Sequence, residues 1–237
     1  MKLSIIIPVF NEQKTVREII KRVSAIKIKN VKIDITVVDD GSTDKTLSIL
    51  KEISRKNHKF KLIEHEKNSG KGAAVRTGIE GSNGDYIIIQ DADLEYDPIY
   101  YLKLLQPFES NQVDVVYGSR LINYPLNLWG KKKTVLPSHL IANRLLTSFT
   151  NLLYQSNLTD METGYKVFRK KILDNIMIKS NKFDFEAEIT AKILKKGVKI
   201  VEIPIITKPR SYKEGKKIGW QDGVSAIWTL IKYRFIE

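Results

Sequence analysis

Two aspartates, Asp91 and Asp93, directly follow the apolar run at residues 86–90. In extended backbone, residues two apart point to the same side, so both carboxylates can converge on one point, and Glu95 continues the same parity. Paired carboxylate oxygens suit Mg²⁺ or Mn²⁺, which keep further coordination positions for phosphate and water. An acidic turn leading into Asp97 is the alternative. The position after a buried strand favours the metal site.

Three other polar clusters are weaker signals when taken singly. Residues 38–42 (Val-Asp-Asp-Gly-Ser) offer a carboxylate to a nucleobase or ribose, although the same residues form ordinary turns and helix caps. Residues 8–12 place Phe10 where it could lie against a base, or where a helix begins. Residues 70–74 match neither the dinucleotide fingerprint nor the P-loop. Their small side chains permit close helix packing, with Lys71 facing a phosphate.

The elements that must position these clusters alternate between β-branched runs and amphipathic helices. Such alternation predicts an α/β fold with a mainly parallel sheet covered by helices on both faces. Ligands of these sheets lie beyond the carboxyl ends of the strands, where the polar clusters fall. The predicted strands are 3–9, 33–38, 60–64, 86–90, 113–117 and 199–204, and the predicted helices are 12–26, 44–53, 70–81, 138–155, 183–195 and 219–235. With no linker between the halves, we expect a single domain over residues 1–237.

Composition excludes several classes of protein. The 237 residues include 40 Lys and Arg against 27 Asp and Glu, a net charge of +13, and no cysteine. An apolar content of 42% rules out a wholly disordered chain, and no run approaches the roughly 20 apolar residues of a membrane span. No disulfide framework is possible, and no convincing signal peptide is present, so we expect a cytoplasmic protein. Basic clusters at 131–133, 166–171 and 213–217 favour anionic membrane surfaces or phosphorylated substrates; without a basic stripe and stacking aromatics, we expect no nucleic-acid partner.

Taken in order, the motifs at 8–12, 39–42, 70–73 and 91–94 resemble those of glycosyltransferase family 2, whose members have the GT-A nucleotide-sugar-binding fold. The later motifs at residues 118–120, 163–168, 183–186, 209–210 and 215–217 are similar to the dolichyl- and polyprenyl-phosphate sugar transferase branch, such as the dolichol-phosphate mannosyltransferases. The resemblance extends from about residue 3 to residue 223. It implies a nucleotide-sugar-binding half at 1–118 and an acceptor half at 119–237.

The resemblance also implies roles for individual residues. The nucleoside would be held by Pro8, Phe10, Glu12, Val38 and Asp40. The divalent ion, Mg²⁺ or Mn²⁺, would be bound by Asp91, Asp93 and Glu95, with Ala92 packed beside the donor; Glu95 stands where the mannosyltransferases commonly have Gln. The donor and acceptor phosphates would be faced by Arg120, Arg144 and Arg210, with Lys217 on the acceptor side. Asp93, Arg120 and Arg210 would be the catalytic residues, and Lys166, Lys170 and Lys171 are expected on the surface.

The leading hypothesis is therefore a metal-dependent inverting transferase that moves a mannose- or glucose-type sugar from a GDP- or UDP-linked donor to polyprenyl phosphate. An acceptor hydroxyl on a saccharide or protein is the alternative, and it would need Asp160 or Glu162 as a general base. A non-enzymatic nucleotide or anionic-surface binder would not need the aspartate pair. A nucleotidyltransferase would carry a Gly-rich loop with arginine where this chain has residues 11–13.

A lipid acceptor requires contact with a bilayer. Many members of the branch carry C-terminal membrane spans, whereas this sequence ends at Glu237, so we expect a peripheral protein on the cytoplasmic membrane face. The helix at 138–155, together with Trp220 and Trp228, offers apolar side chains for that contact. An ordinary core helix would show the same pattern.

Overall fold

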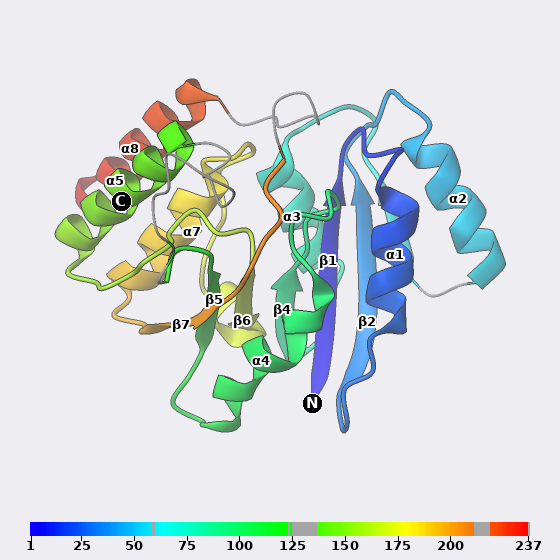
Figure 1. Cartoon of the computed structure of the whole chain (residues 1–237), viewed down its shortest axis with the longest axis horizontal. Coiled ribbons are helices and arrows are strands. Elements are labelled where there is room, and N and C mark those ends of the chain that lie inside the picture. Colours follow the sequence, from blue (N-terminus) through cyan, green and yellow to red (C-terminus); the bar gives the residue numbers. More distant parts are fainter. Residues whose placement is uncertain (58–59, 123, 125–136, 211–218, 237) are drawn as a thin grey trace, which may run out of the picture.

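The computed structural model describes residues 1–57, 60–122, 124, 137–210 and 219–236, and its centre is a seven-stranded sheet (Figure 1). The strand order is β3-β2-β1-β4-β6-β5-β7. The bounds are β1 Lys2–Val9, β2 Lys32–Asp39, β3 Lys61–Glu64, β4 Tyr86–Ile89, β5 Val115–Ser119, β6 Lys166–Arg169 and β7 Ile200–Pro204. Only β6 runs against its neighbours, pairing antiparallel with both β4 and β5. The predicted mainly parallel sheet is therefore present, with one reversed strand inserted near its middle.

Helices cover both faces of the sheet, as the alternating pattern predicts. Their bounds are α1 Val16–Ala25, α2 Thr46–Asn57, α3 Lys71–Glu80, α4 Tyr101–Leu105, α5 Pro137–Tyr154, α6 Lys170–Leu173, α7 Phe185–Lys195 and α8 Trp220–Phe235, with short 3₁₀ turns η1 Pro98–Tyr100 and η2 Gln106–Glu109. Figure 1 shows α1 and α2 beside β1 and β2, and α5, α7 and α8 grouped at the opposite side of the molecule. No helix among the described residues is both long and apolar enough to cross a membrane.

The two faces of β1 belong to two different hydrophobic clusters. Ile5 and Ile7 pack with α1 and α4 on one face, whereas Ile6 packs with α3 and α7 on the other. This division follows from the two-residue period of a strand, because successive side chains point to opposite faces. A third cluster joins α5 and α8 to α7, so these two helices form an outer layer away from the sheet.

Strand β6 was not predicted, and its burial corrects one expectation. Lys166, which the sequence analysis placed on the surface, is fully buried in β6. Lys170 is half-buried and its ammonium donates to the carbonyl of Ser82, while Lys171 is exposed as expected. A strand of only four residues with a basic residue at each end lacks the apolar run that identifies the other strands.

The reversed direction of β6 has a direct consequence for the site. Its first residue pairs near the last residues of β4 and β5, since Val167 is opposite Ile88 and Lys166 is opposite Tyr117. The segment leading into β6, residues 160–165, therefore arrives at the same edge of the sheet as the carboxyl ends of the parallel strands. That edge carries the candidate site.

Candidate active site

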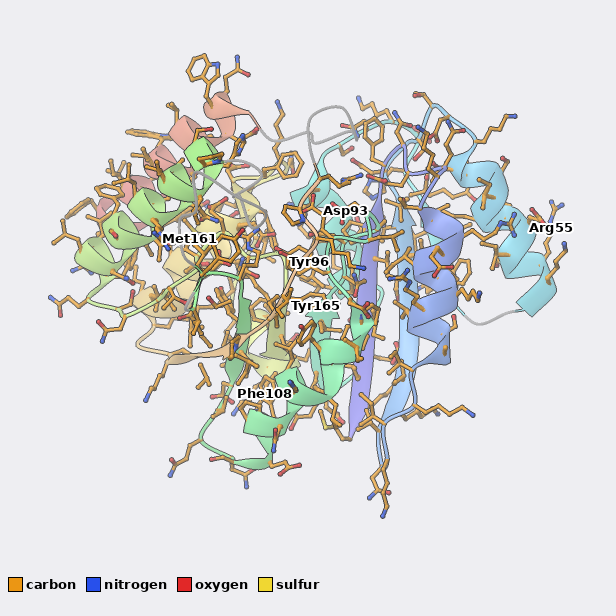
Figure 2. All side chains as sticks on the ribbon, viewed as in Figure 1. Arg55, Asp93, Tyr96, Phe108, Met161 and Tyr165 are labelled. Atoms are coloured by element: carbon orange, nitrogen blue, oxygen red, sulfur yellow. The ribbon has the colours of Figure 1, made fainter. Side chains whose placement is uncertain are left out.

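A pocket of about 460 Å³ opens at the carboxyl ends of β1, β2 and β4. Its lining includes most of the residues singled out from the sequence: Pro8, Phe10, Glu12, Asp40, Lys71, Asp91, Ala92, Asp93, Glu95, Arg120, Glu162 and Arg210. Figure 2 shows Asp93 at this edge of the sheet, with Tyr96 and Tyr165 lying deeper in the molecule. The structure thus brings together side chains from segments that are up to about 200 residues apart in the chain, as expected for a parallel sheet.

Two of the predicted site residues lie elsewhere, and a third is not among the described residues. Val38 is fully buried within β2 and does not line the pocket. Arg144 is exposed on α5, where its guanidinium donates to the carbonyl of Tyr124. Lys217 falls outside the described residues, as do the basic clusters at 131–133 and 213–217. The roles expected for these residues stay predictions.

A buried hydrogen-bond network fixes the segment that carries the carboxylates. The side-chain amide of Gln90 donates to the carbonyls of Asp91 and Tyr96, at 2.9 and 3.2 Å. Its oxygen accepts from the hydroxyls of Tyr101 and Tyr165, both at 2.7 Å. Since three of these four hydrogen bonds are buried, breaking the network would leave unpaired polar atoms, which is costly. The side chain of Gln90 therefore holds the segment after β4 through the backbone carbonyls of that segment.

The carboxylates at the end of β4 face cations from two other segments. Asp91 Oδ1 lies 2.8 Å from the ammonium of Lys71. Asp93 Oδ2 lies 2.8 Å from Nη2 of Arg210, and Glu95 Oε1 lies 3.5 Å from its Nε. Burial raises the pKa of Asp93 to about 7, and the negative charges of Asp91 and Glu95 add to the rise. The group therefore retains negative charge that the two cations do not fully offset.

The residues present fit a divalent cation held by two carboxylates rather than three. Among the described residues, no three His, Cys, Asp or Glu side chains are grouped as ligands of one ion. Asp91 and Asp93 nevertheless supply hard oxygen ligands. Burial and, after it, the charge of Asp91 disfavour the ionised form of Asp93, and a bound cation would favour that form. Glu95 accepts from both the backbone N–H and the guanidinium of Arg210, so its place as a third ligand stays a prediction.

The start of β6 packs directly against this carboxylate pair. A Cβ atom on Gly164 would lie 2.3 Å from Oδ2 of Asp91, so no larger residue fits there without moving the carboxylate. The N–H of Gly164 donates to the hydroxyl of Tyr96 at 2.8 Å, which fixes the approach. Glycine at this position is thus explained by the space that Asp91 occupies.

A model of the family described as glycosyl transferase family 2 matches residues 4–177. The chain belongs to glycosyltransferase family 2. An uncharacterised protein of Methanocaldococcus jannaschii is 30% identical, covering 98% of this chain and 99% of that protein. A dolichol-phosphate mannosyltransferase of Pyrococcus furiosus is 28% identical over 92% of this chain and 60% of its own length, so the chain spans about three fifths of that relative.

The fold of this glycosyltransferase is that of solved GT-A enzymes. The structure of glucosyl-3-phosphoglycerate synthase from Mycobacterium tuberculosis, in complex with Mn²⁺, UDP and glucosyl-3-phosphoglycerate, matches with a TM-score of 0.71 at 18% identity. The match covers all of this chain and 81% of the synthase. The predicted family, the resemblance to its polyprenyl-phosphate sugar transferase branch, the GT-A fold and the enzyme class are confirmed.

On one side of the pocket of this glycosyltransferase, Arg120 is fixed by a buried acid. Its Nε and Nη2 donate to the two oxygens of Asp160 at 2.7 Å each, and its backbone N–H donates to the same carboxylate. Asp160 is fully buried, and Glu202 accepts from its N–H. Although burial lowers the pKa of Arg120, the charge of Asp160 raises it well above its usual value. This bidentate pair orients the guanidinium and leaves Asp160 without a free oxygen to act as a base.

Glu162 lines the pocket, and none of the cations in the described part of the chain forms an ion pair with it. One of its oxygens, Oε1, is buried and has no hydrogen-bond partner among the described residues. Burial raises the pKa of Glu162 to about 7, against the opposing effect of Lys166. Of the two acids that the sequence offered as a general base, Asp160 has both oxygens engaged by Arg120, whereas Glu162 keeps an oxygen without a partner among the described residues.

The carboxylate of Asp40, which was expected to hold the nucleoside, accepts hydrogen bonds from groups of the protein. It accepts from Nδ1 of His65 at 2.7 Å and from the backbone N–H groups of Ser69 and Gly70 at 3.0 and 2.7 Å. The side-chain amide of Asn68 donates a fourth hydrogen bond at 3.0 Å. A carboxylate has about four lone-pair positions, so Asp40 shapes the loop at 65–70 and the start of α3. Sequence reasoning missed His65, since nothing in its spacing links it to Asp40.

Sequence reasoning also missed the buried pair formed by Lys166 and Glu186. The ammonium of Lys166 lies against Oε2 of Glu186, at the first turn of α7. One signal for this pair was available, because Lys166 alternates with the apolar Phe168 and both fall on one face of the strand. The acidic partner 20 residues later could not be inferred from that pattern.

Proposed function

We propose that this glycosyltransferase moves a hexose, of the mannose or glucose type, from a GDP- or UDP-linked donor to a polyprenyl phosphate, with inversion at the anomeric carbon. The observation that carries the proposal is the charge of the pocket: two arginines, Arg120 and Arg210, line it, and the buried Asp160 is already neutralised. The name of the Pyrococcus relative, which aligns over 92% of this chain, supports the same acceptor.

A phosphate acceptor suits this arrangement of charges. The oxygen of a phosphate monoester is already largely ionised near pH 7, so it attacks the anomeric carbon without a strong base. What it requires is positioning by cations, and an arginine fork does this better than a lysine. Arg120, fixed by Asp160, would orient one phosphate. Arg210, shared among Glu12, Asp93 and Glu95, would leave these carboxylates for a phosphate that enters the pocket.

The donor would lie along the opposite wall of the pocket. Pro8 and Phe10 line the wall where the base would bind, and Asp40 holds the adjoining loop. Asp91 and Asp93 would hold Mg²⁺ or Mn²⁺. When bound, the ion supplies Lewis-acid chemistry that neutralises the diphosphate leaving group. In this assignment residues 1–118 bind the donor and residues 119–237 bind the acceptor.

The outer layer of α5 and α8 would meet the membrane. Exposed apolar side chains gather on it, namely Ile141, Leu145, Leu152, Trp220, Val224, Ile227, Trp228 and Phe235. Helix α5 contains no acidic residue, and the single acid of α8, Asp222, accepts from the N–H of Gly219 at its own helix start. Exposed cations on the same helices, Arg144 and Arg234, complement anionic lipid headgroups. Through this face the enzyme would bind the cytoplasmic side of the membrane as a peripheral protein and so reach a lipid phosphate.

The test is release of nucleoside diphosphate by the purified protein across a panel of nucleotide-sugars with Mn²⁺, with and without polyprenyl phosphate in detergent. We expect one donor to respond to the lipid, with labelled sugar moving to the organic phase. If polyprenyl phosphate does not change the rate of nucleoside diphosphate release with any donor, the proposal of a lipid acceptor is wrong. Asp91→Ala should abolish turnover while keeping the circular dichroism spectrum, because it removes a proposed metal ligand.

Glu162 favours a second candidate, in which the acceptor is a hydroxyl on a saccharide or protein. Its unpartnered oxygen and raised pKa are properties of a general base. With a hydroxyl acceptor, Glu162→Gln should reduce kcat by about 10²-fold or more and remove the rise in rate through pH 7. With polyprenyl phosphate as acceptor, the same substitution should leave the pH profile in place.

A further inference from the structure

Lys166 lies beneath the pocket with its ammonium fully satisfied. It donates to the carbonyl of Met161 at 3.1 Å, to the carbonyl of Thr163 and to Oε2 of Glu186, which match its three protons. The ring of Tyr117 lies 4.7 Å from the ammonium and adds a cation–π contact. A charge this deeply buried is tolerated only because it is paired and hydrogen-bonded. Glu186 is therefore held rigidly from below.

The other oxygen of Glu186 faces the pocket. Oε1 lies 3.0 Å from the ammonium of Lys71, and that ammonium lies 2.8 Å from Oδ1 of Asp91. Lys166, Glu186, Lys71 and Asp91 thus form a row of alternating charges that runs from the core to the proposed metal ligand. Although burial lowers the pKa of Lys71, the charges of Asp91 and Glu186 raise it above its usual value, so its ammonium stays charged.

Lys71 and a divalent cation compete for the same carboxylate. An ammonium held by Asp91 alone would form a tight pair and block the cation, whereas an ammonium shared with a second acid is bound less tightly to the first. Glu186 is that second acid. Since its distance to Lys71 is nearly the same as that of Asp91, it retains Lys71 when Asp91 turns to another ligand.

We propose that Glu186 is a positioning residue that, anchored by Lys166, retains the ammonium of Lys71 and so keeps Asp91 available to a divalent cation. This inference rests on the proposed function, because it takes Asp91 as a ligand of the ion.

The test is a double-mutant cycle on Mn²⁺ affinity, measured by electron paramagnetic resonance on unaltered protein, Glu186→Gln, Lys71→Met and the double variant. Glu186→Gln should weaken Mn²⁺ binding by about tenfold or more, the range seen when the partner of a metal ligand is removed. In the Lys71→Met background, the same substitution should change the affinity by less than about twofold, because no ammonium is left to compete.

Three results would overturn the inference. An unchanged Mn²⁺ affinity in Glu186→Gln would show that Glu186 has no effect on the site. An equal loss in both backgrounds would show that Glu186 acts by its charge alone and not through Lys71. Absence of Mn²⁺ binding by the unaltered protein would remove the ion from the proposed function, and this inference would fall with it.

Two further variants guard against a folding defect. Glu188→Gln is the matched control, because Glu188 lies on the same helix and is buried, yet it accepts from the N–H groups of Lys179 and Ser180 and contacts Lys192 rather than Lys71. It should keep the Mn²⁺ affinity of the unaltered protein. Where Glu186→Gln does not fold, Lys166→Met combined with Glu186→Gln removes both buried charges together and should show the same loss of affinity.

Discussion

The two arginines of the pocket are held in opposite ways. Arg120 makes a bidentate pair with one fully buried acid at 2.7 Å. Arg210 is divided among three carboxylates that are less deeply buried than Asp160, with distances of 2.8 Å to Asp93, 3.3 Å to Glu12 and 3.5 Å to Glu95. Arg120 is thus held in one orientation by its acid, whereas Arg210 can exchange one carboxylate partner for another.

This difference separates stability from ligand response. Removing one partner of a buried pair leaves an uncompensated charge in the core, which is costly to folding. A cation shared among several carboxylates, none of them fully buried, leaves no fully buried charge behind when it turns to an incoming anion. We therefore expect Arg120 to matter for the fold and for orientation, and Arg210 to matter chiefly for turnover.

Arg120→Met should produce the largest effect. It leaves Asp160 buried without its partner, so the free energy of unfolding should fall by about 3–5 kcal/mol, measured by urea denaturation at pH 7. Replacing Asp160 by Asn in the same protein should recover part of this loss, because the unpaired charge is removed. A loss below about 1 kcal/mol would show that Arg120 is no more firmly held than Arg210.

Arg210→Met should reverse the pattern. We expect kcat to fall by about 10²-fold, equivalent to about 2.7 kcal/mol of transition-state stabilisation, because a cation facing the phosphates is lost. The free energy of unfolding should fall by less than in Arg120→Met, because none of the carboxylates that face Arg210 is as deeply buried as Asp160. A large loss of stability with normal kcat would contradict the comparison.

Glu162→Gln should give the smallest effect, and it depends on pH. The pKa of Glu162 is raised from 4.5 to about 7 in the folded protein, so the folded state binds its proton more tightly than the unfolded chain. Stability from this group therefore falls as pH rises from about 4.5 to 7 and stays low above that window. The substitution should raise the free energy of unfolding by about 1–2 kcal/mol at pH 8 and leave it unchanged at pH 4, by urea denaturation.

Much of the fold follows from local pattern. The apolar runs that became β1, β2 and β4 are long or strongly β-branched, and the apolar positions of α1 recur at helical spacing, so their existence could be predicted with ends off by a few residues. Because parallel strands end at one edge, the meeting of Asp40, Asp91 and Phe10 at one pocket also followed. These inferences need only sequence neighbours.

The pairings that tune the site were not predictable in the same way. Arg120 and Asp160 are 40 residues apart and meet only because β6 is inserted between β4 and β5. Lys166 looked like a surface residue because a lysine is buried only with a charged partner. Its partner, Glu186, comes from helix α7, 20 residues later in the chain. Asp160 is paired with an arginine, whereas Glu162 is not. This difference depends on neighbours in three dimensions, which sequence spacing does not reveal.

The insertion of β6 between β4 and β5 also bears on how the chain folds as it is synthesised. Strands β1 to β4 can assemble early, with β1 bonded on both sides, but the outer edge of β4 stays open until the ribosome has made β6. β5 emerges before β6, yet its neighbours in the finished sheet, β6 and β7, both come later. An unpaired strand edge can pair with other chains, so a nascent chain stalled before residue 166 should be prone to aggregation. The pairing of β6 that closes this edge also brings Glu162 and Gly164 to the pocket.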